Sequence, residues 1–187
     1  MKPIVKDTVA GDIPVFQAIY ETAQGGFSSG ETVLAAGTTV KSGTVIGYDE
    51  TTRVAKVAKY AVNKNVSGTS DTTYEVYKNH NLVVGMSVKV AAGTAYAITN
   101  IDTSNGLHDV ITVGTTLSAS AVAAGAIIFV DDDGVNKARG LLLDETVLAT
   151  GSDFAVVLRG TVYENRINPV DATLKALMPN IIFSKSF

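Results

Sequence analysis

Residues 32–58 read TVLAAGTTVKSGTVIGYDETTRVAKVA, and this stretch decides the fold class. Its three short apolar runs are separated by glycine-containing and acidic turn signals, about ten residues apart. Short strands with this spacing are typical of small barrels and sandwiches. Across the chain, Val, Ile and Thr make up nearly a third of the residues, and their β-branched side chains favour pleated strands over helices. The sequence therefore predicts an all-β protein, with its first clear strands at 32–35, 44–48 and 53–58.

The middle of the chain predicts a second β unit. The run over 53–58 carries Lys56, and Lys59 follows it, which predicts an exposed or edge strand. A polar break over 63–73 comes next, and the apolar runs that follow it end at the acidic turn 131–134. Asn105–Gly106 is the strongest hairpin turn signal in the chain. The strands predicted in this unit cover 74–77, 87–90, 95–99, 109–113 and 126–130.

The last third of the chain predicts three strands, one helix and a closing strand. The three strands are expected at 138–143, 154–159 and 160–164. The helix has Asn168 as its N-cap and Pro169 at its first position, and Pro179 ends it. Its apolar face, at helical spacing, consists of Val170, Leu174, Leu177 and Met178. The closing strand is predicted at 181–183.

The beginning of the chain, residues 1–30, predicts an N-terminal arm. Pro3, Gly11 and Pro14 interrupt it, and residues 25–30 form a joint rich in glycine and serine. The apolar run 15–20 favours extended structure over a short helix. Two placements for this run remain open, either on a neighbouring subunit or as the first strand of the chain's own barrel.

Charge and composition exclude several classes of partner. Fifteen basic residues stand against eighteen acidic ones, giving a formal net charge of −3, so no basic footprint for nucleic acid or anionic membrane is expected. The absence of cysteine removes disulfides, thiolate metal sites and cysteine nucleophiles. The start of the chain lacks the apolar core of a signal peptide, and the most apolar stretch, 121–130, is half the length of a membrane span. These features predict a soluble protein made in a cytoplasm.

The motifs that could carry chemistry are weak. Residues 26–30, GFSSG, match a nucleophile-elbow pattern, but strand-like residues follow where that motif needs a helix, so a flexible joint is favoured. The acidic run 131–134 lacks the later ligands of a calcium loop and is predicted to be a solvated turn. His80 and His108 are expected in loops. The sequence therefore predicts no enzyme activity, no cofactor and no metal.

Two regions of the chain, one near its beginning and one at its end, resemble known proteins. The glycine-punctuated residues 34–47, followed later by 138–147 and 154–162, resemble the head decoration proteins of tailed phages, of the lambda type. The ending, 160–164 through 176–183, is similar to phage head-fibre proteins. Together the resemblance covers 32–62 and 135–187, about half of the chain. A minimal decoration protein lacks the block that lies between these two regions.

The resemblance implies a structural virion protein that binds the major capsid protein on the outer surface of the head, as a homotrimer, and stabilises the shell. The expected organisation is an arm over 1–30, a discontinuous small β-barrel or sandwich over 31–65 and 132–187 with one short helix, and an outward-facing inserted β domain over 66–131. The alternative is a β module that binds carbohydrate or a cell surface, and a host glycan could bind through the inserted domain. Apolar residues in excess of a small barrel's needs are expected to contact the capsid or a neighbouring subunit; they are Ile4, Val5, Phe16, Ile19, Tyr20, Ile182, Phe183 and Phe187.

Overall fold

The computed structural model describes residues 14–23, 27–91, 93–149 and 151–186. The predicted all-β class is confirmed, because strands dominate and the two α-helices are short. Within the described residues, no helix is long and apolar enough to span a membrane.

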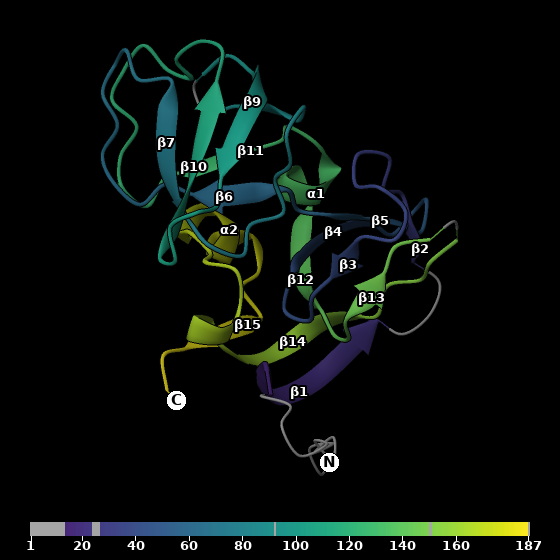
Figure 1. Ribbon diagram of the computed structural model, residues 1–187. Helices are drawn as coiled ribbons and strands as arrows, with labels where there is room; N and C mark the ends of the chain where they lie inside the picture. The colour runs from purple at the N-terminus through teal and green to yellow at the C-terminus, as the bar shows by residue number, and fades with distance from the viewer. Residues whose placement is uncertain (1–13, 24–26, 92, 150, 187) are drawn as a thin grey trace.

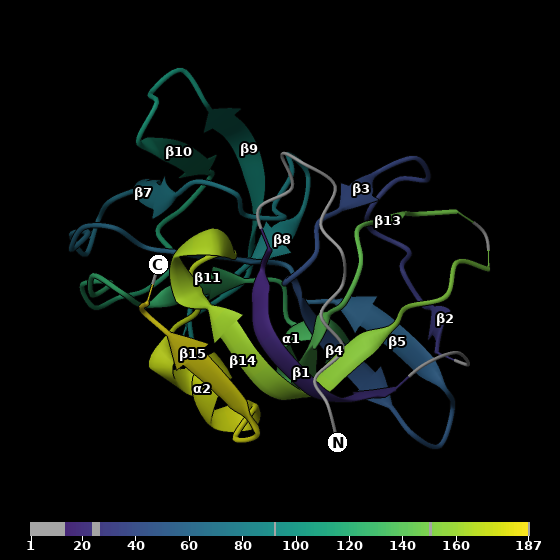
Figure 2. The ribbon, with the colours of Figure 1, turned by 90° about the horizontal axis from the view of Figure 1, so that it is seen from below.

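The largest sheet has seven strands and curls into a half-barrel. Its order starts at β1 and ends at β2, and the last strand of the chain, β15, pairs in parallel with β14. Figures 1 and 2 show β1, β14 and β15 side by side. The seven strands are β1 (Phe16–Ala23), β14 (Val156–Tyr163), β12 (Ala138–Leu142), β4 (Val45–Asp49), β5 (Val54–Val57), β2 (Ser28–Ser29) and β15 (Ile181–Ser184).

A four-stranded antiparallel sheet lies at the opposite end of the molecule from β1 (Figure 1). Strands β9 and β10 form a hairpin around Asn105–Gly106, as the turn signal predicts. The strands, in sheet order, are β7 (Thr73–Tyr77), β10 (His108–Val113), β9 (Tyr96–Asp102) and β8 (Ser87–Val88).

Two small ribbons complete the strand set. In the first, β6 (Tyr60–Val62) pairs with β11 (Ile127–Phe129), so the chain enters and leaves the predicted inserted block through neighbouring strands. In the second, β3 (Thr39–Val40) pairs with β13 (Thr146–Val147). Isolated bridges connect Asn63 to Val76 and Lys89 to Phe129. They join the first ribbon to the four-stranded sheet.

The interior consists of two clusters of buried apolar side chains. One contains side chains of both large sheets, for example Ile46 from β4 and Ile111 from β10. The other lies between the half-barrel and the C-terminal helix and includes Val162 and Leu174. The domain boundaries predicted at 65/66 and 131/132 stay a prediction, because a shared core does not decide whether either part folds alone.

The helices differ from the sequence expectation. The C-terminal helix α2 (Ala172–Leu177) starts later than predicted, and Asp171 is its N-cap instead of Asn168, accepting the amide of Leu174 at 2.8 Å. The acidic run expected as a turn opens α1 (Asp133–Asn136), whose N-cap is Asp132. A 3₁₀ turn, Glu164–Arg166, was not predicted.

Two strand predictions need correction, and one open placement is decided. Residues 32–35 form no strand, although Leu34 is buried. The two strands expected over 154–164 are one, β14. The run 15–20 lies largely in β1, paired antiparallel with β14 of the same chain, which is the second of the two placements left open. Residues 1–13 and 24–26 of the predicted arm lie outside the described residues.

Candidate functional site

The outer surface formed by β1, β14 and β15 is the first candidate site. On β14, Arg159 is exposed while its neighbours Gly160 and Val162 are buried. Thr161, between those two, lies opposite Ile182 of β15, whose side chain is 61 % exposed. Tyr20 of β1 is 58 % exposed. From the exposed and half-buried side chains of these strands we define the β1–β15 surface as Tyr20, Arg159, Thr161, Tyr163 and Ile182.

Cations cover the aromatic rings of this surface. The Arg159 guanidinium lies 5.9 Å from the centre of the Tyr20 ring, and that of Arg166 lies 4.3 Å from the Tyr163 ring. Such contacts contribute about 0.5–1 kcal/mol at exposed sites and more when a partner excludes water. Aromatic and arginine side chains are also the residues that most often dominate binding at protein interfaces. The β1–β15 surface therefore has the composition of an interaction surface.

The outer edge of β1 is also open. Among the described strands, β1 is the last of its sheet and pairs only with β14. Irregular pairing between Ile19 and Thr22 bends it. A groove of about 1110 Å³ runs beside it and is lined by residues 14–20 together with the loop 79–83. An unpaired edge can accept a strand from another chain.

The structure divides the predicted contact residues into three groups. Tyr20 and Ile182 are exposed, as a contact surface requires. Phe16, Ile19 and Phe183 are half-buried against the second core cluster, so part of each side chain stabilises the chain's own fold. Ile4, Val5 and Phe187 lie outside the described residues.

The sequence motifs for chemistry do not come together. Ser28 belongs to the short strand β2, and its side chain donates to the carbonyl of Arg53. His80 and His108 lie near different acidic residues, Asp109 and Glu75. No group of three His, Cys, Asp or Glu side chains that could hold a metal is present in the parts of the chain that the structure describes.

His80 is buried close to Asp109. Its Nε2 atom lies 3.3 Å from Asp109 Oδ2, and its Nδ1 atom accepts the amide of Leu82 at 3.2 Å. Lys78 contacts the other oxygen of Asp109 at 2.5 Å. Burial lowers the pKa of His80 below its ordinary 6.5, and Asp109 opposes this shift. The ring is therefore more easily protonated in the unfolded chain than in the fold.

This shift predicts a loss of stability in acid. The contribution of neutral His80 is fully present above pH 6.5 and is lost as the pH falls through the lowered folded pKa. Between about pH 7.5 and about pH 5, the free energy of unfolding should fall more steeply for the wild-type protein than for His80→Gln. Urea unfolding at each pH measures the difference, and parallel curves for the two proteins would contradict the prediction.

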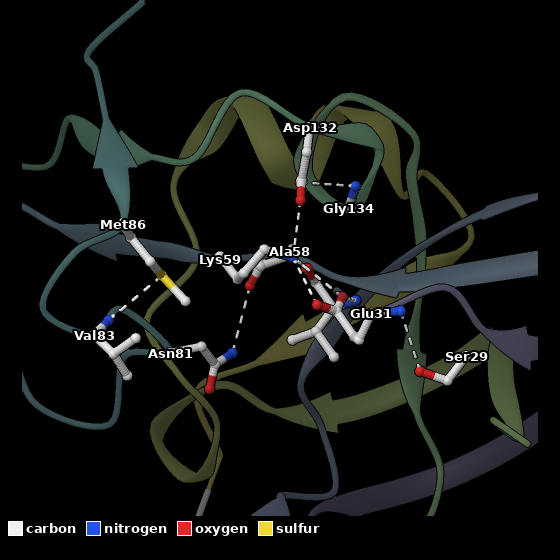
Figure 3. A network of polar contacts seen from close by, with 10 residues as sticks. Ser29, Glu31, Ala58, Lys59, Asn81, Val83, Met86, Asp132 and Gly134 are labelled. Atoms are coloured by element: carbon white, nitrogen blue, oxygen red, sulfur yellow. Dashed lines mark hydrogen bonds and ion pairs between the residues drawn. The ribbon is translucent and has the colours of Figure 1, made fainter. Parts of the chain in front are cut away.

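A buried charge cluster is the second candidate site (Figure 3). Lys59 lies between β5 and β6, and its side chain is fully buried. Its Nζ atom lies 3.1 and 3.0 Å from the two carboxylate oxygens of Glu31 and 2.8 Å from Oδ2 of Asp132. It also donates to the carbonyl of Val57 at 3.0 Å. We call Lys59, Glu31 and Asp132 the buried triad.

Each carboxylate of the triad is held by a backbone amide. Glu31 Oε1 accepts the amide of Val57 at 2.6 Å, and Asp132 Oδ1 accepts that of Gly134 at 3.0 Å. The side chains of Glu31 and Asp132 are 3 % and 17 % exposed. With all three groups ionised, the cluster carries one net negative charge with little water, which is a costly arrangement.

Two glycines allow α1 to approach the sheet closely enough to place Asp132 beside Lys59. A Cβ atom on Gly134 would lie 2.2 Å from the carbonyl oxygen of Val57. A Cβ atom on Gly47 of β4 would lie 2.2 Å from the carbonyl oxygen of Asp133. Backbone therefore packs on backbone at both contacts, and a side chain at either position would push Asp132 away.

The sequence prediction for Lys59 is wrong. It placed this residue on an exposed or edge strand, whereas its side chain is among the largest that are completely buried. Glu31 was not singled out at all, and Asp132 was read as part of a solvated turn. Comparison of the chain with family models, curated proteins and solved structures gives no match.

Proposed function

We propose that this protein is a non-enzymatic structural protein that binds the outer surface of a phage capsid through its β1–β15 surface. The observation that carries the proposal is the open edge of β1 beside the exposed side chains of Tyr20 and Ile182. The open edge supports docking on another protein, and the resemblance to phage head decoration proteins supplies the capsid as the partner.

The arrangement of the sheets supports a direction for this docking. Strands β1 and β15 lie at one end of the molecule and the sheet β7–β10–β9–β8 at the other (Figure 1). With β1 against the capsid, the four-stranded sheet faces outward. The homotrimer that the resemblance implies stays a prediction.

A paired surface variant tests the proposal. Replacing Tyr20 and Ile182 together by serine should weaken binding to heads stripped of the protein by about tenfold or more, because exposed apolar anchors contribute most of the binding free energy. Both side chains are more than half exposed, so the fold should be retained. Co-sedimentation with the heads measures the binding.

The matched control is Leu107→Ser. Leu107 is 78 % exposed and lies in the β9–β10 turn, outside the β1–β15 surface. This variant should bind like the wild-type protein. Unchanged binding of the double serine variant, or equal weakening by Leu107→Ser, would contradict docking through the β1–β15 surface.

A further inference from the structure

The buried triad has the components of a condensation reaction between two side chains. An amine and a carboxylate lie in contact, at 2.8 Å between Lys59 Nζ and Asp132 Oδ2, and a second carboxylate, Glu31, touches the same amine. We propose that Lys59 and Asp132 join in an isopeptide bond, with Glu31 as the proton relay. This inference does not depend on the proposed capsid function.

Contact geometry assigns different roles to the two carboxylates. Glu31 faces Nζ with both oxygens at nearly equal distances, 3.0 and 3.1 Å. Either oxygen can take up a proton from the amine and return it, so this bidentate contact suits proton exchange. Asp132 contacts the amine through one oxygen alone.

The Gly134 amide completes the site at Asp132. It donates to Oδ1 at 3.0 Å, the oxygen that does not contact Lys59. Negative charge develops on this oxygen when the amine adds to Cγ, and a fixed backbone donor stabilises that charge. The Val57 carbonyl meanwhile holds one hydrogen of the amine, which orients the nitrogen.

The reaction balances without an oxidant, a reductant or a second substrate. Glu31 accepts a proton from the Lys59 ammonium, and the neutral nitrogen attacks Cγ of Asp132 to form the C–N bond. Glu31 returns this proton to Oδ2 and then relays a second proton from the attacking nitrogen to Oδ2, the Cγ–Oδ2 bond breaks, and one water leaves with two of the three ammonium hydrogens. The three side chains carry the same net charge before and after.

Burial favours this bond in two ways. The reacting groups are held in contact by the fold, which removes the entropic cost of bringing them together. Little water reaches the pair, since the side chain of Lys59 is fully buried and that of Asp132 is 17 % exposed, and a dry site strengthens every electrostatic contact within it. Lys137 at the surface also contacts two carboxylates, Asp49 at 2.9 Å and Asp133 at 3.3 Å, but its side chain is 39 % exposed, so this cluster lacks the burial.

Intact-protein mass spectrometry of the wild-type chain under denaturing conditions tests the bond. The expected mass is lower than the sequence mass by one water molecule. Trypsin should then yield a branched peptide in which residues 57–64, uncut after Lys59, are joined to residues 90–137 at Asp132. A full-mass protein after prolonged incubation would overturn the proposal, and so would a link to residues 7–41, which contain Glu31.

Two variants and one internal control sharpen the result. Lys59→Arg should have its full mass. This variant retains the sequence Asp133–Gly134, so a full mass excludes ring closure there as the source of the lost water. Glu31→Gln with a wild-type circular dichroism spectrum should also stay at full mass, and equal crosslinking in this variant would overturn the relay. Cleavage after Lys137 in the same digest should be complete, because its exposed pair with Asp49 is expected to stay unlinked.

Discussion

Replacing Lys59 by methionine is expected to lower the free energy of unfolding by about 3–5 kcal/mol, because two carboxylates then remain in the interior without a cation. Methionine is similar in length to lysine and fills the same space, so the change isolates the charge. Lys59 compensates the charges of Glu31 and Asp132 in the interior, and its removal leaves both uncompensated. A large loss is therefore expected whether or not the isopeptide bond forms. Urea denaturation at neutral pH measures the change.

The matched control is Lys137→Met, which removes the ion pairs of Lys137 with Asp49 and Asp133 at the surface. Lys137 is 39 % exposed and contacts Asp49 at 2.9 Å. Exposed pairs contribute about 0–1 kcal/mol, since water and salt screen them. If the two methionine variants lose similar amounts of stability, burial of the triad does not make the loss of its cation more costly.

Replacing Gly134 by alanine is expected to destabilise the protein by about 1–3 kcal/mol, the usual cost of forcing an extra group into a packed site. The added Cβ would meet the Val57 carbonyl at 2.2 Å, and backbone cannot move aside as a flexible side chain can. Alanine favours helices over glycine by about 1 kcal/mol. Helix preference alone would therefore make the alanine variant more stable. A loss of stability would instead identify the close packing of α1 on β5 as the cause.

Gly114→Ala provides the comparison for this variant. No atom lies within 4 Å of the position that its Cβ would occupy. Its stability should stay within about 0.5 kcal/mol of the wild-type value, as for most surface changes. A Gly134→Ala protein as stable as Gly114→Ala would show that α1 can move away from β5 without cost.

The pattern of apolar residues was sufficient to predict two kinds of strand: those in which buried and half-buried residues alternate, and those in which every residue is buried. The runs at 44–48, 74–77, 109–113 and 126–130 correspond to β4, β7, β10 and β11. In β10, buried and half-buried residues alternate along the strand, and this period is visible in the sequence. Each of these strands also ends near a turn signal, so its length could be estimated.

Glycine explains one of the strand errors. Gly160 was the first residue of a separate predicted strand, 160–164, and it lies instead inside β14. A Cβ atom there would lie 2.6 Å from the carbonyl oxygen of Ala18 in β1. The residue is therefore small because a neighbouring backbone passes close to it, and a sequence does not distinguish this reason from a turn.

The buried triad could not be predicted from pattern, because its members come from three separate parts of the chain. A lysine in a β run is normally assigned to solvent, and its burial depends on partners that sequence spacing does not bring together. One signal was available. Residues 54–62 read VAKVAKYAV, and Ala58, Tyr60 and Ala61 give Lys59 apolar neighbours on both sides. All three of these neighbours are buried.

The pairing of β6 with β11 also has a mechanical consequence. Lys59 directly precedes β6, and Asp132 follows β11 by three residues, so their contact lies at the base of the segment that these two strands open and close. A pulling force applied to the hairpin of β9 and β10 travels down both strands and reaches this contact before it reaches the half-barrel. While this contact holds, the two strands cannot separate at their base, so the segment is expected to move as one unit under load.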